Sequence, residues 1–298
     1  MTDLRPPPPQ QMANPRASPQ PFDPLDPRIS SEEYRKLYAA CDSDEPASLD
    51  AFLATLGPRK TLRGLDAGFR HAMSHGKYRL MRHLLSNKSI IIDEAVVQDA
   101  LSIGSMQLLD FLRESGWDDV NMQVQPGCTP LLLVHSNLPL VSYLLSYGAD
   151  PNLGPAINAA VGMAGAHQLV PDSGAILSGA VRWGSIECVD LLISHGAILG
   201  NASPVHASVE GGSMDMLLHV LGIGGNVDEM DSFAIFGREC CGTPLIRAIK
   251  KGELEMVRVL LAKGGSRTIR GYRGCGTPLE LVKEEWVLPD IKVIVENY

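Results

Sequence analysis

Three histidines have the spacing that metal chemistry would need. His71 and His75 are four residues apart, so a helix would place both imidazoles on one face, where they could share a metal ion, and His83 follows eight residues later. No glutamate stands between the first two as in a His-Glu-x-x-His metalloprotease, and no carboxylate is positioned in the sequence as a third ligand. We therefore expect a surface or partly packed histidine pair and no metal site.

The cysteines are the second set of reactive side chains. They are Cys41, Cys128, Cys188, Cys240, Cys241 and Cys275. The absence of a Cys-x-x-Cys pair disfavours both a zinc site and a secreted scaffold held by disulfides. Because Cys240 and Cys241 precede Gly242 as Cys275 precedes Gly276, equivalent loops carry thiols. We interpret them as small loop residues, with a redox or metal role as the alternative.

A glycine-rich stretch, residues 222–226, is the nearest approach to a cofactor-binding loop. It follows an apolar, helix-like segment rather than a strand, and it lacks the third glycine of a dinucleotide-binding fingerprint. No Ser-His-Asp arrangement, phosphate-cradling loop or isolated acidic pair is present either. The sequence therefore predicts no enzyme, no cofactor and no small-molecule substrate.

Composition and charge exclude other classes of function. The chain has 298 residues, 45% of them hydrophobic, and a formal net charge of -8, which disfavours nucleic acids and anionic membranes as partners. Nine of the 21 prolines precede Ile29, which predicts a disordered Pro-rich tail over residues 1–29, with a docking peptide as the alternative role. Residues 1–30 have no secretory pattern, and no stretch reaches the roughly 18 apolar residues of a membrane span. We expect the protein in the cytoplasm or nucleus.

One signature recurs through residues 30–298. Its clearest copy begins Thr243-Pro244-Leu245 and has glycines seven and nineteen positions after the leucine, at Gly252 and Gly264. The positions equivalent to this leucine, which we call origin residues, are Leu37, Phe69, Val97, Leu131, Leu177, Val205, Leu245 and Leu279. Their spacing scatters around about 33 residues, which is typical of a stacked repeat array.

The signature residues have physical reasons for their places. A threonine such as Thr243 caps the exposed amides of a helix start, and Pro244 fits the first helical position. The glycine at offset seven ends this short helix in a left-handed conformation, and a second helix follows with an inward leucine pair such as Leu260 and Leu261. Each unit is therefore predicted to be a helix, a turn, a second helix and a projecting loop.

These motifs resemble those of the ankyrin-repeat family. The Thr-Pro-Leu start is found at 129–131, 243–245 and 277–279, and the Leu-Leu…Gly-Ala-Asp ending at 144–152. The resemblance implies an all-α solenoid of about eight units over residues 30–298, the first degenerate and the last a terminal cap. Residues 153–172 and 228–241 lengthen two loops, either as recognition features or as drifted loops.

The resemblance also implies a non-catalytic protein-binding module, an adaptor or scaffold, that binds a partner protein through its concave groove and loop tips as a monomeric array. In a stacked array, exposed positions form rows. We predict these row and loop-tip residues as partner-binding: Trp183, Arg182, Glu210, Lys250, Lys251, Arg270, Tyr272, Arg273, Phe233 and Phe236. Trp183 is either an interface anchor or a cover for a neighbouring helix. The alternatives are an acidic inhibitor that masks a basic surface of a nucleic-acid-binding factor and, more remotely, a metal- or thiol-dependent enzyme.

Overall fold

The computed structural model describes residues 29–87, 90–155, 168–230, 242–272 and 274–298. The predicted tail up to residue 28, the loop residues Phe233, Phe236 and Arg273, and the cysteine pair Cys240 and Cys241 lie outside the described residues. The chain packs as two compact units, unit 1 at Met1–Gly116 and unit 2 at Trp117–Tyr298.

Unit 1 consists of consecutive helix pairs. Its described helices are α1 (Ser31–Asp42), α2 (Pro46–Leu53), α3 (Pro58–Ser74), α4 (Tyr78–Ser86), α5 (Glu94–Ile103) and α6 (Met106–Glu114). The origin residues Leu37, Phe69 and Val97 lie on α1, α3 and α5, and each is at most 1% exposed. The apolar positions that the repeat pattern selects therefore form the core of this unit.

Helix α3 differs from the short first helix that the repeat predicts, because it has 17 residues. Pro58 starts it early, at a position where the missing N–H costs nothing. A glycine then lets it lie close to α2, because a Cβ added at Gly64 would lie 3.0 Å from Leu53 Cδ2. The extra turns thus pack against α1 and α2 instead of projecting into solvent.

Unit 2 repeats the helix pair more regularly. Its described elements are α7 (Pro130–Val134), α8 (Leu138–Ser146), β1 (Gly154–Pro155), β2 (Leu169–Val170), α10 (Ala175–Trp183), α11 (Ile186–Ser194), the 3₁₀ helix η1 (Leu199–Asn201), α12 (Pro204–Gly211), α13 (Met214–Gly222), α14 (Pro244–Lys251), α15 (Leu254–Ala262), α16 (Pro278–Leu281) and α17 (Pro289–Asn297). The strands pair antiparallel within the lengthened 153–172 loop. The rest of the described unit is helical or irregular, as the all-α prediction requires.

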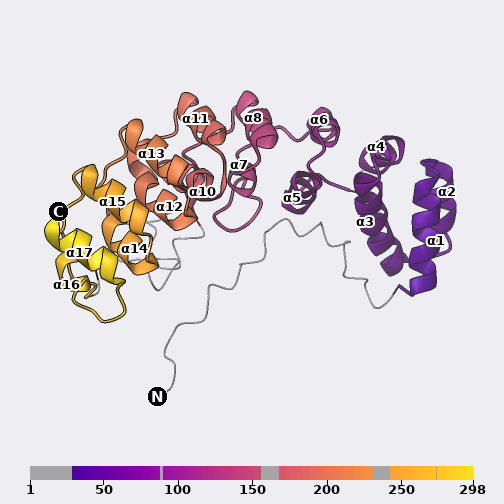
Figure 1. The fold of residues 1–298 in the computed structure, drawn as a ribbon. Helices are drawn as coiled ribbons and strands as arrows, with labels where there is room; N and C mark the ends of the chain where they lie inside the picture. Colours follow the sequence, from indigo (N-terminus) through magenta and orange to yellow (C-terminus); the bar gives the residue numbers. More distant parts are fainter. Residues whose placement is uncertain (1–28, 88–89, 156–167, 231–241, 273) are drawn as a thin grey trace, which may run out of the picture. The chain divides into compact units, whose positions relative to one another are not determined.

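The helices of unit 2 form two rows (Figure 1). Each of α7, α10, α12, α14 and α16 packs against the next, and we call this the first-helix row. The second-helix row consists of α8, α11, α13, α15 and α17. The inward leucines of the second row, such as Leu144, Leu192 and Leu260, are fully buried between the layers. Burial of these leucines holds the layers together.

Local capping explains where the first helices begin and end. The hydroxyls of Thr129, Thr243 and Thr277 accept the predicted hydrogen bonds from backbone N–H groups three residues on. Gly252 ends α14 with φ +74°. Gly184 was expected to do the same for α10, but its φ is -93°, so that expectation is wrong. A Cβ at Gly184 would lie 2.6 Å from the Ala180 carbonyl oxygen, which explains why a glycine is needed there.

Polar loop residues connect successive layers of unit 2. Asn121 donates to the Gly148 carbonyl and accepts from the Asp150 N–H at 2.8 Å. Asn152 bonds in the same way to the Gly196 carbonyl and the Ile198 N–H. These side chains satisfy backbone groups that helix ends leave unpaired. No helix within the described residues has the length and apolar character needed to cross a membrane.

Candidate partner-binding surface

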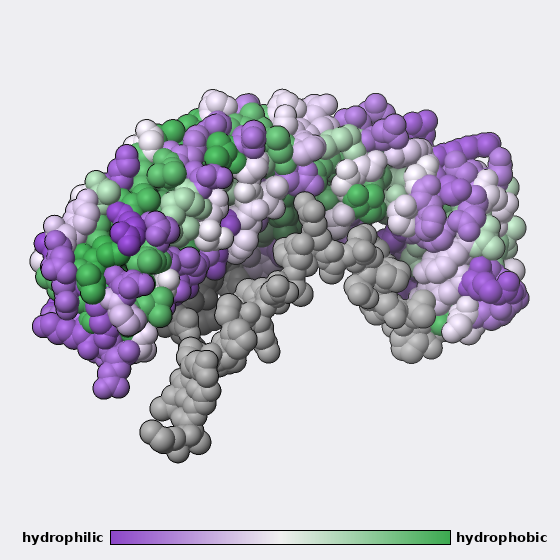
Figure 2. Space-filling view, viewed as in Figure 1, coloured by the Kyte–Doolittle hydropathy of each residue, from purple (hydrophilic) through white to green (hydrophobic). Residues whose placement is uncertain are grey.

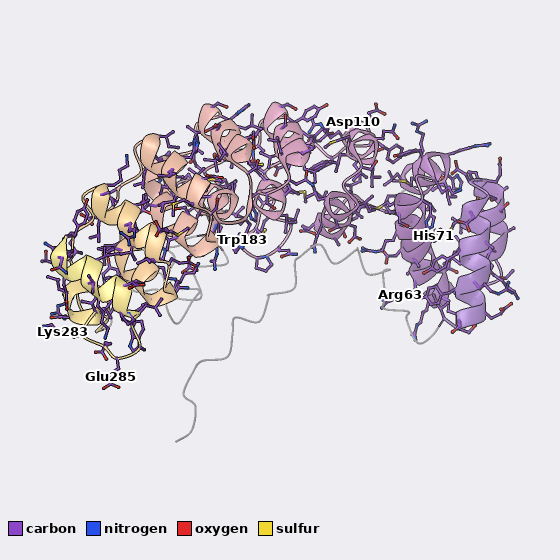
Figure 3. All side chains as sticks on the ribbon, in the orientation of Figure 1. Arg63, His71, Asp110, Trp183, Lys283 and Glu285 are labelled. Atoms are coloured by element: carbon purple, nitrogen blue, oxygen red, sulfur yellow. The ribbon has the colours of Figure 1, made fainter. Side chains whose placement is uncertain are left out.

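Trp183 is the most prominent side chain of the first-helix row. It is the last residue of α10, and 61% of it is exposed (Figure 3). The Arg182 guanidinium lies 4.6 Å from the centroid of its ring, and the His135 ring lies 5.6 Å away at a 55° tilt. These contacts orient the indole and leave most of it open to solvent. An exposed, pre-oriented tryptophan is the residue type that most often anchors a protein interface.

His135, on the preceding layer, supports Trp183 as an uncharged ring. Burial lowers the pKa of His135, because the imidazolium would lose its hydration. Its Nδ1 lies 2.6 Å from the Leu132 carbonyl oxygen, so this nitrogen carries the proton and donates. The ring fits here because residue 179 is glycine: a Cβ at Gly179 would lie 2.7 Å from His135 Cδ2.

Glu210 is the centre of an ion network next to Trp183. Its side chain is 7% exposed; one carboxylate oxygen pairs with Arg182 at 3.4 Å and the other pairs with Arg247. Lys251 donates to the carbonyl oxygens of Val209 at 2.7 Å and Glu210 at 2.9 Å, and burial lowers the pKa of this amine. The charges of Glu210 and Lys251 are therefore engaged within the unit.

A second feature lies near the end of the chain. A pocket of about 440 Å³ is lined by Lys250, Arg270, Glu280, Glu284, Trp286 and the 274–276 turn. Arg270 pairs with Glu280 at 2.5 Å, and both side chains remain exposed. Tyr272, in the same loop as Arg270, is 52% exposed. The charged groups that line this pocket are therefore two cations and two carboxylates, and the aromatic ring of Trp286 lies beside them.

Cys275, beside this pocket, is not the free thiol that the sequence suggests. It is disulfide-bonded, and its sulfur lies 3.0 Å from the Lys250 amine. Cys41, Cys128 and Cys188 are free, and burial raises the pKa of Cys41 to about 12 and that of Cys128 to about 11. Disulfides are typical of oxidising compartments, so the Cys275 disulfide does not favour the cytoplasmic or nuclear location predicted from the sequence. That location stays a prediction.

Comparison with known proteins identifies the repeat. Residues 126–154, which include α7 and α8, match the model of the ankyrin repeat family. The chain has the fold of an ankyrin repeat domain. Among solved structures, the human ASB11 ankyrin repeat domain is similar with a TM-score of 0.56 and 18% identity, over 77% of this chain and 98% of that one. The ankyrin repeat domain of Bcl-3, described as a unique member of the IkappaB protein family, gives a TM-score of 0.40 and 18% identity, over 71% and 77%. No curated protein matches by sequence.

The ankyrin-repeat architecture confirms the fold class predicted from the sequence, and the match of residues 126–154 agrees with the predicted family. Ankyrin repeat domains generally mediate protein–protein interactions and are generally non-catalytic. Of the predicted binding residues, the structure brings Arg182, Trp183, Glu210 and Lys251 together in one cluster, and Lys250 and Arg270 in another.

Sequence reasoning missed three residues of the ankyrin surface. His135 and Arg247 contact neighbours from other layers, so no local pattern shows what they bind. Trp286 lies in the predicted terminal cap and was not among the predicted binding residues, although it is 54% exposed beside the pocket. A polar Arg247 inside the otherwise apolar Leu245–Ile249 segment was the one available signal.

The histidine expectation needs a correction. No carboxylate was expected near His71 and His75, but the Asp42 Oδ1 atom lies 2.8 Å from His71 Nε2. Asp42 comes from α1 of the preceding ankyrin layer, 29 residues earlier, where no sequence motif would reveal it. His83 is not part of this group, because it pairs with Asp50 of α2 at 3.1 Å.

Proposed function

We propose that the chain is a non-catalytic binding module, an adaptor or scaffold, whose protein partner contacts the first-helix row of unit 2. The observation that carries the proposal is Trp183, which is 61% exposed while Arg182 and His135 hold its ring in place. A rigid aromatic loses little side-chain freedom when it is covered, so its burial contributes most of its area to affinity.

The ion network has a supporting role in this proposal. Glu210 and Lys251 bond within the unit, so they shape and stiffen the surface around the tryptophan. The direct contacts come from groups that reach solvent, namely Trp183, Tyr272 and Arg270. Stiffening of the row lowers the entropy that binding must remove.

The alternative as an acidic inhibitor receives less support from this surface. The row offers Arg182, Arg247, Lys250 and Lys251 against Glu210 and Glu280, so it is not an acidic face that would cover a basic one. Interfaces that depend on charge complementarity lose affinity steeply with salt. We expect a weak salt dependence for the partner of this surface.

The test is a quantitative capture experiment. A partner retained by the tagged wild-type chain from native cell extract is identified and purified, and its Kd is then measured for the wild type and for Trp183→Ala combined with Tyr272→Ala. Loss of two interface aromatics is expected to weaken binding by at least about 30-fold, because each such anchor contributes about 1–2 kcal/mol or more. Helical content and the melting temperature should not change.

The matched control is Tyr147→Ala. Tyr147 is 44% exposed at the end of α8, on the second-helix row. This row also exposes apolar residues, such as Leu218 and Ile223 on and after α13, and Figure 2 shows hydrophobic surface over this part of unit 2. If Tyr147→Ala weakens binding while the double variant does not, the partner uses the second-helix row and the proposal is wrong.

A further inference from the structure

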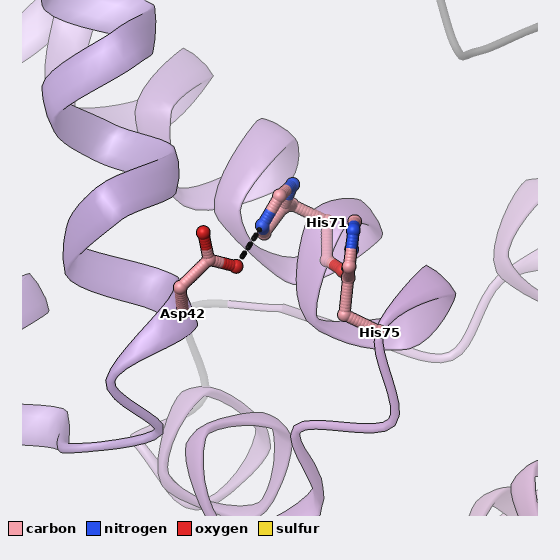
Figure 4. A group of neighbouring side chains, drawn as sticks. All are labelled: Asp42, His71 and His75. Atoms are coloured by element: carbon pink, nitrogen blue, oxygen red, sulfur yellow. Dashed lines mark hydrogen bonds and ion pairs between the residues drawn. The ribbon is translucent and has the colours of Figure 1, made fainter.

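Three side chains of types that bind metal ions meet at one point of unit 1, whereas the proposed binding surface belongs to unit 2. Asp42 is the last residue of α1, His71 lies in the last turn of α3, and His75 is the C-cap of α3. One ligand atom of each lies within 4.8 Å of the other two, and Figure 4 shows the carboxylate pointing at the His71 ring with His75 beside it. The ligands of a tetrahedral zinc ion lie about 3.4 Å apart. Because Asp42 and His75 are exposed, small side-chain rotations can close the remaining difference.

The hydrogen bonds around His75 leave it ready to bind a metal ion. Its Nδ1 lies 2.9 Å from the His71 carbonyl oxygen, which can only accept, and 2.9 Å from the Ser74 hydroxyl, whose own proton is donated to that carbonyl, so Nδ1 carries the proton. The lone pair is then on Nε2, on the far side of the ring. A histidine whose other nitrogen donates to a backbone carbonyl is the usual arrangement of a metal ligand.

His71 is held in place by its neighbours. Its ring stacks on Tyr38 with centroids 4.5 Å apart and on His75 with centroids 4.0 Å apart. Its Nε2 faces the Asp42 carboxylate at 2.8 Å, and a cation can replace the shared proton between these two ligand atoms. This packing keeps the imidazole near one orientation before any ion arrives.

The local field favours a cation. Asp42 ends α1, and the two histidines end α3, so two helix C-termini with partial negative charge converge on the cluster. A carboxylate at such a position is unfavourable unless a cation compensates it. The Lys77 amine partly does so, by donating to the Asp42 backbone carbonyl at 2.7 Å, but it leaves the carboxylate to His71.

A simple pair of aspartate and histidine also occurs elsewhere in the described residues. Asp190 and His219 connect α11 and α13 at 2.7 Å, as Asp42 and His71 connect α1 and α3. Such a pair alone is explained as a hydrogen bond between layers. What distinguishes the Asp42 cluster is the second histidine, which turns a pair into a three-ligand set.

We propose that Asp42, His71 and His75 form a binding site for a divalent transition-metal ion, with Zn²⁺ as the best match. Imidazole and carboxylate ligands suit Zn²⁺, and three protein ligands leave a fourth position for water. The site lies entirely within unit 1, so it does not depend on the proposed partner surface of unit 2.

The test is calorimetric titration of the full chain with zinc chloride, after alkylation of accessible thiols to remove binding by cysteine. The wild type is expected to bind one Zn²⁺ ion with a micromolar Kd, and His75→Ala is expected to weaken this binding at least tenfold. His219→Ala, which breaks the two-residue pair in unit 2, should bind as the wild type does. Circular dichroism of each variant shows whether the helices remain intact.

The outcomes separate the alternatives. If wild type and His75→Ala bind Zn²⁺ equally, or neither binds it, the cluster is only a hydrogen-bonded contact between layers and the proposal is overturned. If His75→Ala loses its fold, His75→Gln, which keeps a polar side chain at this exposed position, replaces it in the same titration. As a second readout, excess Zn²⁺ should raise the melting temperature of the wild type and of His219→Ala but not that of the His75 variant.

Discussion

The Asp42 cluster in unit 1 and the Glu210 cluster in unit 2 both join first helices of neighbouring layers, but their carboxylates have different surroundings. Glu210 is 7% exposed, and both of its oxygens pair with arginines. The Asp42 side chain is 55% exposed and has one hydrogen-bonding partner side chain, His71. The first carboxylate has its charge compensated within the protein, and the second retains lone pairs that face solvent.

This difference separates a structural cluster from one that can bind a ligand. A nearly buried carboxylate must be paired, because desolvation of its charge costs several kcal/mol, so the partners of Glu210 are needed for folding. An exposed carboxylate is solvated whether or not it is paired, and a surface ion pair contributes only about 0–1 kcal/mol. The Asp42 cluster can therefore exchange a proton or bind an ion without loss of the fold.

The largest effect that tests this comparison is expected for Glu210→Ala. The substitution removes the carboxylate that pairs with Arg247, whose side chain is 15% exposed, and with Arg182, and it should destabilise unit 2 by about 3 kcal/mol. Urea unfolding measures the loss. The matched control is Glu255→Ala, which removes an exposed pair with Arg258 within α15 and should cost less than about 0.5 kcal/mol. Equal losses would show that burial does not distinguish the two pairs.

A smaller effect is expected for Arg182→Ala. Its side chain is 42% exposed, and Glu210 keeps Arg247 when it is removed, so the loss should be about 1 kcal/mol in the same urea experiment. The change also uncovers the Trp183 ring, because the cation that lies over it disappears. A loss as large as that of Glu210→Ala would mean that Arg182, and not Arg247, compensates the buried carboxylate.

The sequence predicted the features that depend on local signals. Threonine caps, left-handed glycines such as Gly252, and buried origin residues all act within a few positions of the chain, and the structure confirms them apart from Gly184 and the half-buried Leu279. The Asp42–His71 and Arg182–Glu210 contacts join residues 29 and 28 positions apart, about one repeat, and no local pattern marks them. Prediction of these contacts requires knowledge of which side chains face each other across two layers.

Gly211 shows that a residue on the exposed row can have a packing role. It has the same offset from its origin residue as Trp183 and is exposed, but a Cβ at residue 211 would lie 2.4 Å from the Arg182 carbonyl oxygen. The glycine therefore allows α10 and α12 to approach closely, and it is structural. Offsets within a repeat predict the face of a helix, whereas the distance between two helices depends on side chains from both.

The smallest expected effect concerns Asp42 and pH. The hydrogen bond from His71, with the charges of His71, His75 and Lys77, lowers the pKa of Asp42. A lowered folded-state pKa stabilises the protein above the unfolded value of about 3.9, and this contribution is lost as the pH falls through the folded-state pKa. The free energy of unfolding of the wild type, relative to Asp42→Asn, should therefore fall by less than about 1 kcal/mol between pH 5 and pH 2.

The control is the same comparison in a His71→Ala background. There the difference in free energy of unfolding should hardly change with pH, because the main cause of the pKa shift is gone. An equal pH dependence in both backgrounds would mean that the helix ends and Lys77, rather than His71, control this carboxylate, and the contrast with Glu210 would then rest on burial alone.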